Sequence, residues 1–309
     1  MTPAKDTNWI TKFNIHITSN SNKVFGNGRH QLEVSVSVTP KLGVQITQEQ
    51  LDSIRLVTLG DDGHYHELSG DLRMSTERDK RFEYYADTGA PPAPLLAANT
   101  LRRRFYVSST RSGGTLDVIY AAISKDEATH YVSHTTPFIT SITVETLTPL
   151  RLNRDDFAFE AEDNHFQVID ATEWNYDVNQ LFIKSRTLKL VDAIAYGPTS
   201  GKAYFQNVIE EDSGWDFDGL TPDISKSFTH IGYGVSDQRE FPVTNATLSV
   251  NRYPNSMVFI RIFTYGISWL SGTTTIDAQW GLLDQYGNEH RIKMTQRNDG
   301  QYIDFVMTN

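Results

Sequence analysis

The sequence has no cysteine among its 309 residues, which excludes disulfide bonds, thiolate metal sites and cysteine nucleophiles. It also lacks a long apolar stretch. The longest uninterrupted hydrophobic run, residues 118–123, has six residues, whereas a membrane-spanning helix needs about 20. No tract of biased composition indicates collagen, a coiled coil or a disordered chain. We therefore expect a folded protein without a transmembrane segment.

Several functional signatures are missing as well. The opening residues, MTPAKDTNWITKFN, lack the apolar centre of a secretory signal peptide. We expect an extracellular or surface location reached without a visible signal, and a cytoplasmic location stays open. The chain has no phosphate-binding loop, dinucleotide fingerprint, Gly-x-Ser-x-Gly elbow or His-Glu-x-x-His motif. These absences favour a protein that is not an enzyme and needs no organic cofactor.

What the sequence does contain is the alternation of apolar and polar residues that is typical of a strand with one buried face. Helical periodicity is scarce, and one short helix is expected at Thr47–Asp52, where a hydroxyl N-cap precedes good helix formers. This pattern predicts an all-β fold. Its clearest segments are residues 13–17, 32–38, 54–57, 105–107, 116–119, 142–144, 188–196, 246–250, 258–265, 275–283, 289–295 and 302–307.

We expect two domains: an immunoglobulin-like β-sandwich over residues 8–147 and a larger acidic β domain of the sandwich type over 148–309. The boundary falls where a strand ends before Pro149. Residues 1–143 hold 15 basic and 15 acidic side chains, whereas residues 144–309 hold 13 and 23. The stretch 197–245, rich in Gly, Asp and Ser, predicts a long irregular loop with a functional role.

Two segments resemble each other across these halves. Residues 59–68 and 283–292 match at a Leu, a Gly and a His, and both predict a hairpin with a glycine turn. The match leaves open whether the two domains arose by duplication or share only the same turn chemistry.

The stretch Val24–Thr39, VFGNGRHQLEVSVSVT, resembles the opening of bacterial immunoglobulin-like repeats of the invasin and intimin type. In those repeats an Asn-Gly turn precedes a strongly alternating strand that ends in Thr. The resemblance covers about sixteen residues of the N-terminal domain. It implies an immunoglobulin-like sandwich that acts as an extracellular or surface-displayed binding module.

The segment 210–219, EEDSGWDFDG, concentrates five carboxylates and two aromatic rings. Trp215 can stack on a sugar ring while Asp216 and Asp218 accept hydrogen bonds from its hydroxyl groups, and Tyr233 is the fourth expected ligand-binding residue. Because calcium prefers several carboxylate oxygens from a flexible loop, Asp212, Asp216 and Asp218 are also candidate calcium ligands. A solvated acidic loop without a ligand explains the same residues.

Three other groups have both a chemical and a structural interpretation. His64 and His66, with His130 and His134, could hold a metal, or be polar residues just past a hairpin turn. Asp156, Glu160 and Glu162 could be paired carboxylates of a glycoside hydrolase, or guard an edge strand. Arg102–Arg104 could bind nucleic acid, but the acidic balance favours an edge-strand guard or a contact with the acidic half, so no nucleic-acid partner is expected.

The sequence therefore predicts a non-enzymatic recognition module of a bacterial surface, secreted or particle-associated protein, whose ligand is a glycan or a protein. An alternative is a secreted toxin or effector in which one β domain binds a receptor. A third hypothesis is a carbohydrate-active enzyme in which Glu160 or Asp216 faces a second carboxylate. Calcium is the one cofactor considered, and the unequal charge of the halves permits an oligomer.

Overall fold

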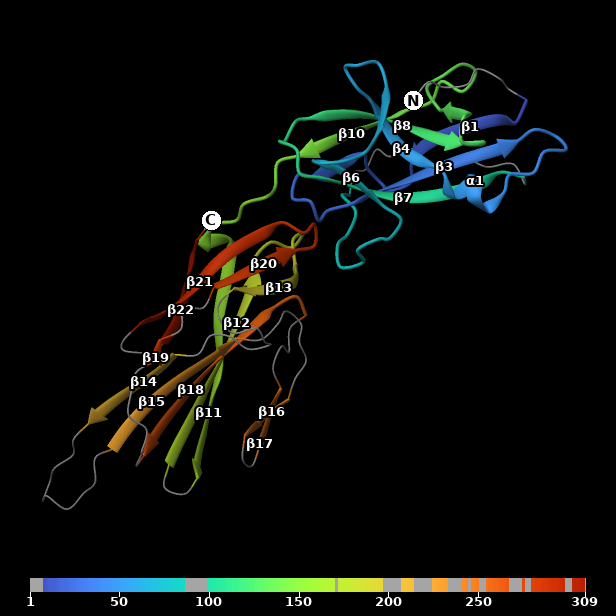
Figure 1. Ribbon diagram of the computed structural model, residues 1–309. Coiled ribbons are helices and arrows are strands. Elements are labelled where there is room, and N and C mark those ends of the chain that lie inside the picture. The colour runs from blue at the N-terminus through green and yellow to red at the C-terminus, as the bar shows by residue number, and fades with distance from the viewer. Residues whose placement is uncertain are drawn as a thin grey trace, which may run out of the picture. The chain divides into compact units, whose positions relative to one another are not determined.

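The computed structural model describes residues 8–86, 99–169, 172–196, 207–213, 224–232, 240–243, 246–249, 254–266, 274–275, 279–297 and 302–308. Within these ranges, the side chains of residues 162–177, 207–232, 240–249, 260–275, 296–297 and 302 are outside this description. The predicted all-β class is confirmed (Figure 1): over the described ranges the helical elements are α1 (Gln48–Asp52) and the single turn η1 (Arg154–Asp156). None of these helices is long and apolar enough to span a membrane.

The chain divides into two compact units: Met1–Pro149 with Tyr286–Asn288, and Leu150–Gln285 with Glu289–Asn309. The first unit contains two sheets whose strands pair antiparallel, apart from the parallel pair β2 and β10. One sheet has the order β1 (Ile10–Ile17), β3 (Leu32–Pro40), β7 (Leu101–Ser109), β6 (Leu72–Ser75). The other has the order β2 (Lys23–Phe25), β10 (Ile142–Leu147), β8 (Leu116–Ser124), β4 (Arg55–Leu59), β5 (Tyr65–Glu67), with β9 (His130–Val132) beside β8.

Apolar side chains from both sheets fill the space between them in the first unit. Strand β3 contributes Val34 and Val36 and β7 contributes Phe105, while β8 contributes Ile119 and β10 contributes Val144, all of them buried. Burying one such side chain stabilises the fold by roughly 1.5–3 kcal/mol. The period-two alternation of 32–38 and 142–144 therefore marks the inner face of this sandwich, as the sequence predicted.

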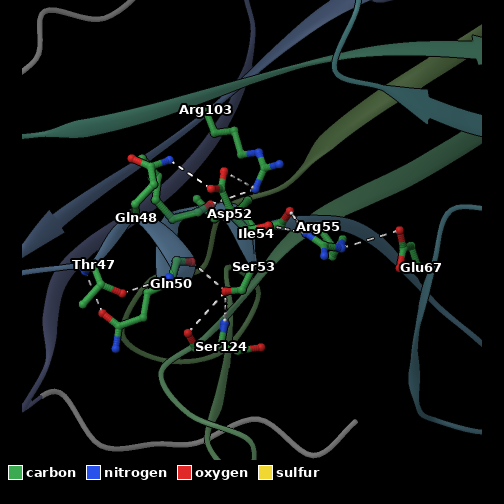
Figure 2. A network of polar contacts seen from close by, with 11 residues as sticks. Thr47, Gln48, Gln50, Asp52, Ser53, Ile54, Arg55, Glu67, Arg103 and Ser124 are labelled. Atoms are coloured by element: carbon green, nitrogen blue, oxygen red, sulfur yellow. Dashed lines mark hydrogen bonds and ion pairs between the residues drawn. The ribbon is translucent and has the colours of Figure 1, made fainter.

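The predicted helix forms between β3 and β4 and is capped as its sequence requires (Figure 2). The Thr47 hydroxyl accepts from the Gln50 backbone N–H at 3.2 Å, and the Gln50 side-chain oxygen accepts from the Thr47 N–H at 3.0 Å. At the other end, the Ser53 hydroxyl donates to the Gln50 carbonyl at 2.6 Å and accepts from the Ser124 N–H at 2.9 Å. These hydrogen bonds position a helix whose residues all stay at least partly exposed, with Leu51 packed against the core.

The second unit contains a six-stranded sheet, a four-stranded sheet and a two-stranded ribbon. The six-stranded sheet has the order β11 (Phe157–Ile169), β12 (Thr172–Ile183), β18 (Met257–Gly266), β15 (Ile224–Gly232), β14 (Asn207–Ser213), β19 (Thr274–Thr275). The four-stranded sheet has the order β13 (Leu190–Tyr196), β20 (Gln279–Asp284), β21 (Glu289–Arg297), β22 (Tyr302–Met307). The ribbon pairs β16 (Glu240–Val243) with β17 (Ala246–Ser249).

A line of aromatic rings joins the two larger sheets of this unit. Phe157 and Phe159 on β11 each meet Phe305 on β22 in a perpendicular contact, at 6.0 and 5.7 Å between ring centroids. Phe259 on β18 meets Trp280 on β20 at 6.1 Å. Perpendicular ring pairs add to the stabilisation that burial itself gives. The second unit is therefore also built by two sheets packed face to face.

The structure corrects the prediction of a long irregular loop over 197–245. Strands β14, β15 and β16 lie within that stretch, and residues 275–283 are divided between β19 and β20. In β15 the apolar residues Ile224, Phe228 and Ile231 are four and three positions apart, so no period of two is visible. Pairing with β14 on one side and β18 on the other forms the strand in spite of that spacing.

The two predicted hairpins are both present. Strands β4 and β5 pair through Leu59 and Tyr65, and β20 and β21 pair through Leu283 and Glu289. Each turn holds one glycine in the left-handed region, Gly63 at φ 75° and Gly287 at φ 73°. A residue with a Cβ rarely adopts this backbone conformation, which explains why glycine recurs at the same place in both segments.

The capping box predicts the effect of Thr47→Ala. Loss of the hydroxyl leaves the Gln50 N–H without its acceptor, so we expect the free energy of unfolding to fall by about 1 kcal/mol. Thr47→Ser keeps the acceptor and should retain most of this stability. Urea denaturation followed by circular dichroism measures both variants. An equal loss in the two would show that the methyl group, and not the hydrogen bond, matters.

Candidate binding surfaces

Four of the residues predicted to bind a ligand or calcium, Trp215, Asp216, Asp218 and Tyr233, lie outside the described residues. Asp212 lies on β14 and pairs with Ser225 on β15. The expectation that 210–219 form a single loop is therefore wrong for its first four residues, which continue β14 to Ser213. Because Ser213 pairs with Ile224, residues 214–223 connect two adjacent antiparallel strands at one end of the sheet.

The described residues next to this connection and next to Tyr233 lie at opposite ends of one strand. Ile224 begins β15, whereas Tyr233 follows Gly232, the last residue of the same strand. A strand of this length spans roughly 27 Å at about 3.3 Å per residue. Ile224 and Gly232 thus lie at opposite ends of β15, and Trp215 and Tyr233 themselves lie outside the described residues.

The edge-strand interpretation is confirmed for Glu160 and Glu162, which lie on β11, the outermost strand of the six-stranded sheet, whereas Asp156 ends the turn η1. Glu160 on this strand lines a pocket of about 540 Å³ within the second unit. We call it the β12–β13 pocket; its other lining residues include Phe182, Arg186, Leu188, Lys189 and Asn255. Of the described residues that line it, Glu160 is the one carboxylate.

The histidines predicted as metal ligands have other partners. His66 Nε2 donates to the Asp62 carboxylate at 2.9 Å, and the His64 backbone N–H donates to the same group at 2.9 Å. These hydrogen bonds, with that from His66 first in importance, lower the pKa of Asp62. His130 contacts the Ser124 hydroxyl at 2.9 Å. Within the described ranges no three His, Asp or Glu side chains are grouped to hold a metal ion.

The arginine run lies on β7 in the segment that pairs with β3 on one side, whereas the described pairing of β7 with β6 covers only Tyr106–Ser109. Arg103 donates to the Leu51 carbonyl at 3.0 Å and forms an ion pair with Asp52 at 3.4 Å (Figure 2). Arg104 lies 3.9 Å from Glu33. These partners belong to the first unit itself. The expected contact with the acidic half of the chain is not among them.

A second apolar cluster lies on the side of the β8 sheet that faces away from the sandwich core. Val57, Ala122 and Val132 are buried there, with Tyr65 and Tyr120 packed against them. His134 stacks on Tyr120 with ring centroids 4.5 Å apart and an interplanar angle of 20°. The Tyr65 hydroxyl lies 2.8 Å from His134 Nδ1. Burial in this cluster, followed by the proximity of Tyr120, raises the pKa of Tyr65.

The same face continues into exposed aliphatic side chains. Leu116 and Val118 alternate with Tyr120 along β8 and are 64% and 43% exposed, and Leu59, the strand partner of Tyr65, is 46% exposed. We call this surface the β8 face, and it comprises Leu59, Tyr65, Leu116, Val118, Tyr120 and His134. The ion pair between Arg55 and Glu67, at 3.8 Å, joins the neighbouring strands β4 and β5. Contiguous apolar surface with a polar border is typical of an interaction site.

Sequence reasoning missed the β8 face although the sequence contains a signal for it. Residues 118–123 are the longest hydrophobic run in the chain. A strand with one wet face alternates, whereas an uninterrupted run indicates a strand with apolar side chains on both faces. Ile119 and Ala121 point into the core, which leaves Val118 and Tyr120 on the outside.

Comparisons with known proteins give weak likenesses of fold. No protein-family model and no curated protein matches the chain. Among solved structures, a partial N-terminal region of an enterococcal surface protein has 9% identity and a TM-score of 0.24, covering 92% of each chain. The collagen-binding domain of Erysipelothrix rhusiopathiae surface protein RspB has 9% identity and a TM-score of 0.20, covering 98% of this chain and 95% of that one. Invasin, a bacterial integrin-binding protein, has 8% identity and a TM-score of 0.20, covering 96% of this chain and 79% of its own.

The Asp62 contacts predict a measurable titration. Since the folded-state pKa of Asp62 is lowered from 3.8, its hydrogen bonds stabilise the fold above the unfolded pKa, and this stabilisation is lost as pH falls through the folded pKa. We expect His66→Ala to raise the pKa of Asp62 toward 3.8, measured by carboxyl-detected NMR. Asp126, whose pKa is lowered by hydrogen bonds from Thr129, is the internal control and should not change. An unchanged Asp62 would refute the assignment.

Proposed function

We propose that this chain is a non-enzymatic binding module of a bacterial surface, secreted or particle-associated protein, and that its ligand is a protein or a glycan. The observation that carries the proposal is the β8 face. Its exposed Leu116 and Val118 lie beside the stacked rings of Tyr120 and His134. Aliphatic and aromatic side chains grouped in this way favour a protein surface as the ligand.

The resemblance of residues 24–39 to bacterial immunoglobulin-like repeats supports the extracellular setting. The sandwich itself supports a binding role in general terms, because its rigid sheets present faces and end connections to solvent. A glycan would use the connection 214–223 instead, with Trp215 on the sugar ring and Asp216 and Asp218 on its hydroxyl groups. The two possibilities place the ligand in different units, so substitutions can tell them apart.

Binding to a glycan array and to an array of purified host extracellular proteins tests the proposal. We expect saturable binding to at least one member, and Val118→Asp should weaken binding to a protein ligand by about tenfold or more, because it places an unpaired charge in an apolar contact. Trp215→Ala should do the same for a glycan ligand and leave protein binding intact.

Leu42→Asp is the matched control, since Leu42 is fully exposed on the same unit but lies outside the β8 face. Thermal melts of each variant confirm that the fold is retained. No binding on either array would contradict the proposed function. Binding that is equally sensitive to Leu42→Asp and Val118→Asp would contradict the β8 face as its site.

We propose that the carboxylates of Asp212, Asp216 and Asp218 bind a calcium ion. Calcium that binds only the native state raises its thermal stability by mass action. Scanning calorimetry with calcium and with EDTA should shift one transition upward with calcium, and Asp216→Asn with Asp218→Asn should abolish this shift. Magnesium at the same concentration is the control, because it demands a stricter octahedral geometry. Identical melts in calcium and EDTA would refute the site.

A further inference from the structure

We propose that the β12–β13 pocket of the second unit binds a short apolar peptide through its two charged termini. This site is separate from the β8 face and does not rest on the function proposed above. Its volume of about 540 Å³ lies within the roughly 300–1,000 Å³ of pockets that hold small ligands.

The charged side chains that line this pocket are of both signs, and two of them have no partner in the described part of the chain. Glu160 and Arg186 are both exposed, and the side chain of neither makes an ion pair or a hydrogen bond with any residue in the part of the chain that the structure describes. They also do not pair with each other. A ligand that brings an ammonium group to Glu160 and a carboxylate to Arg186 would satisfy both at once. The two termini of a short peptide are such a pair of groups.

The rest of the lining suits the body of an apolar peptide. Phe182, Ile183, Leu188 and Pro254 provide apolar surface, and Ser185 and Asn255 add polar groups to the lining. The Ser185 hydroxyl also accepts from the Thr187 N–H at 3.2 Å. Pockets for small ligands generally combine a mainly apolar lining with a few polar groups that fix orientation. The cationic Lys189 also lines the pocket, which adds to its preference for a carboxylate.

Buried side chains make hydrogen bonds to residues in and next to the lining on both sides of the pocket. Gln285, which is 3% exposed, accepts from the Lys189 N–H at 2.6 Å and donates to the Thr187 carbonyl at 2.7 Å. Its own backbone N–H donates to the Lys189 carbonyl at 3.1 Å. On the other side, the Ser256 hydroxyl next to Asn255 donates to the buried Gln180 at 2.7 Å. Walls fixed in this way lose little conformational entropy when a ligand binds, which favours affinity.

The experiment is an NMR titration of the full chain with three forms of one dipeptide. Leu-Leu carries both charges, N-acetyl-Leu-Leu lacks the ammonium group, and Leu-Leu amide lacks the carboxylate. We expect Leu-Leu to bind most tightly, with saturable shifts at residues 182–189 and 254–255, and each cap to weaken binding about tenfold. Arg186→Gln should weaken Leu-Leu and N-acetyl-Leu-Leu but leave Leu-Leu amide unchanged. Glu160→Gln should give the reverse selectivity.

Arg151→Gln and Glu127→Gln are the matched controls, because both residues are exposed and lie outside the pocket lining. Comparison of the three peptides on the unsubstituted chain keeps the proposal testable even where a variant folds poorly. Equal affinity for the three peptides, absence of saturable shifts, or equal effects of the control substitutions would each overturn it.

Discussion

The packing of two sheets against each other through one face of each is the interaction on which both units depend. In the first unit it buries the valines of β3 against Ile119 and Val144. In the second it brings Phe157 and Phe305 into contact. Because side chains fill these inner faces, a ligand contacts the protein at outer faces, at strand edges or at the connections between strands. The β8 face, the edge strand β11 and the connection 214–223 represent these three kinds of place.

Strand β8 shows how one element can serve both the fold and the surface. Its inward residues Ile119 and Ala121 are buried in the sandwich core. Its outward residues Leu116 and Val118 remain 64% and 43% exposed, so much of their apolar surface stays in water after folding. An apolar side chain stabilises a structure only when it is removed from water, at roughly 25 cal/mol per Å². The outer residues therefore contribute their free energy when a partner covers them, and this is why an apolar outer face indicates binding.

The sequence was a good guide wherever one local pattern decided the structure. Alternation located β3 and β22, and the hydroxyl before 48–52 located the capped helix. It was a poor guide where partners distant in sequence decide. Strand β15 exists because β14 and β18 flank it, and Arg103 is held by Asp52 across the fold. The site follows the same rule in part: the strand pairing of Asp212 with Ser225 was not visible in the sequence, whereas Trp215 and Tyr233 lie outside the described residues and stay predictions.

Charged side chains that already have a partner differ from those that are available to bind a ligand. In the first unit Arg81 is paired with Asp79 at 2.7 Å and His66 with Asp62 at 2.9 Å, so these groups satisfy each other and have little left for a ligand. Exposed pairs of this kind add little to the stability of a fold. In the second unit Glu160 and Arg186 line one pocket without pairing, beside apolar walls that Gln285 and Gln180 hold in place. A charge next to apolar surface is less screened than one in open water and attracts an opposite charge more strongly. The proposed zwitterionic ligand would thus meet both opposite charges beside walls that can also bury its apolar body.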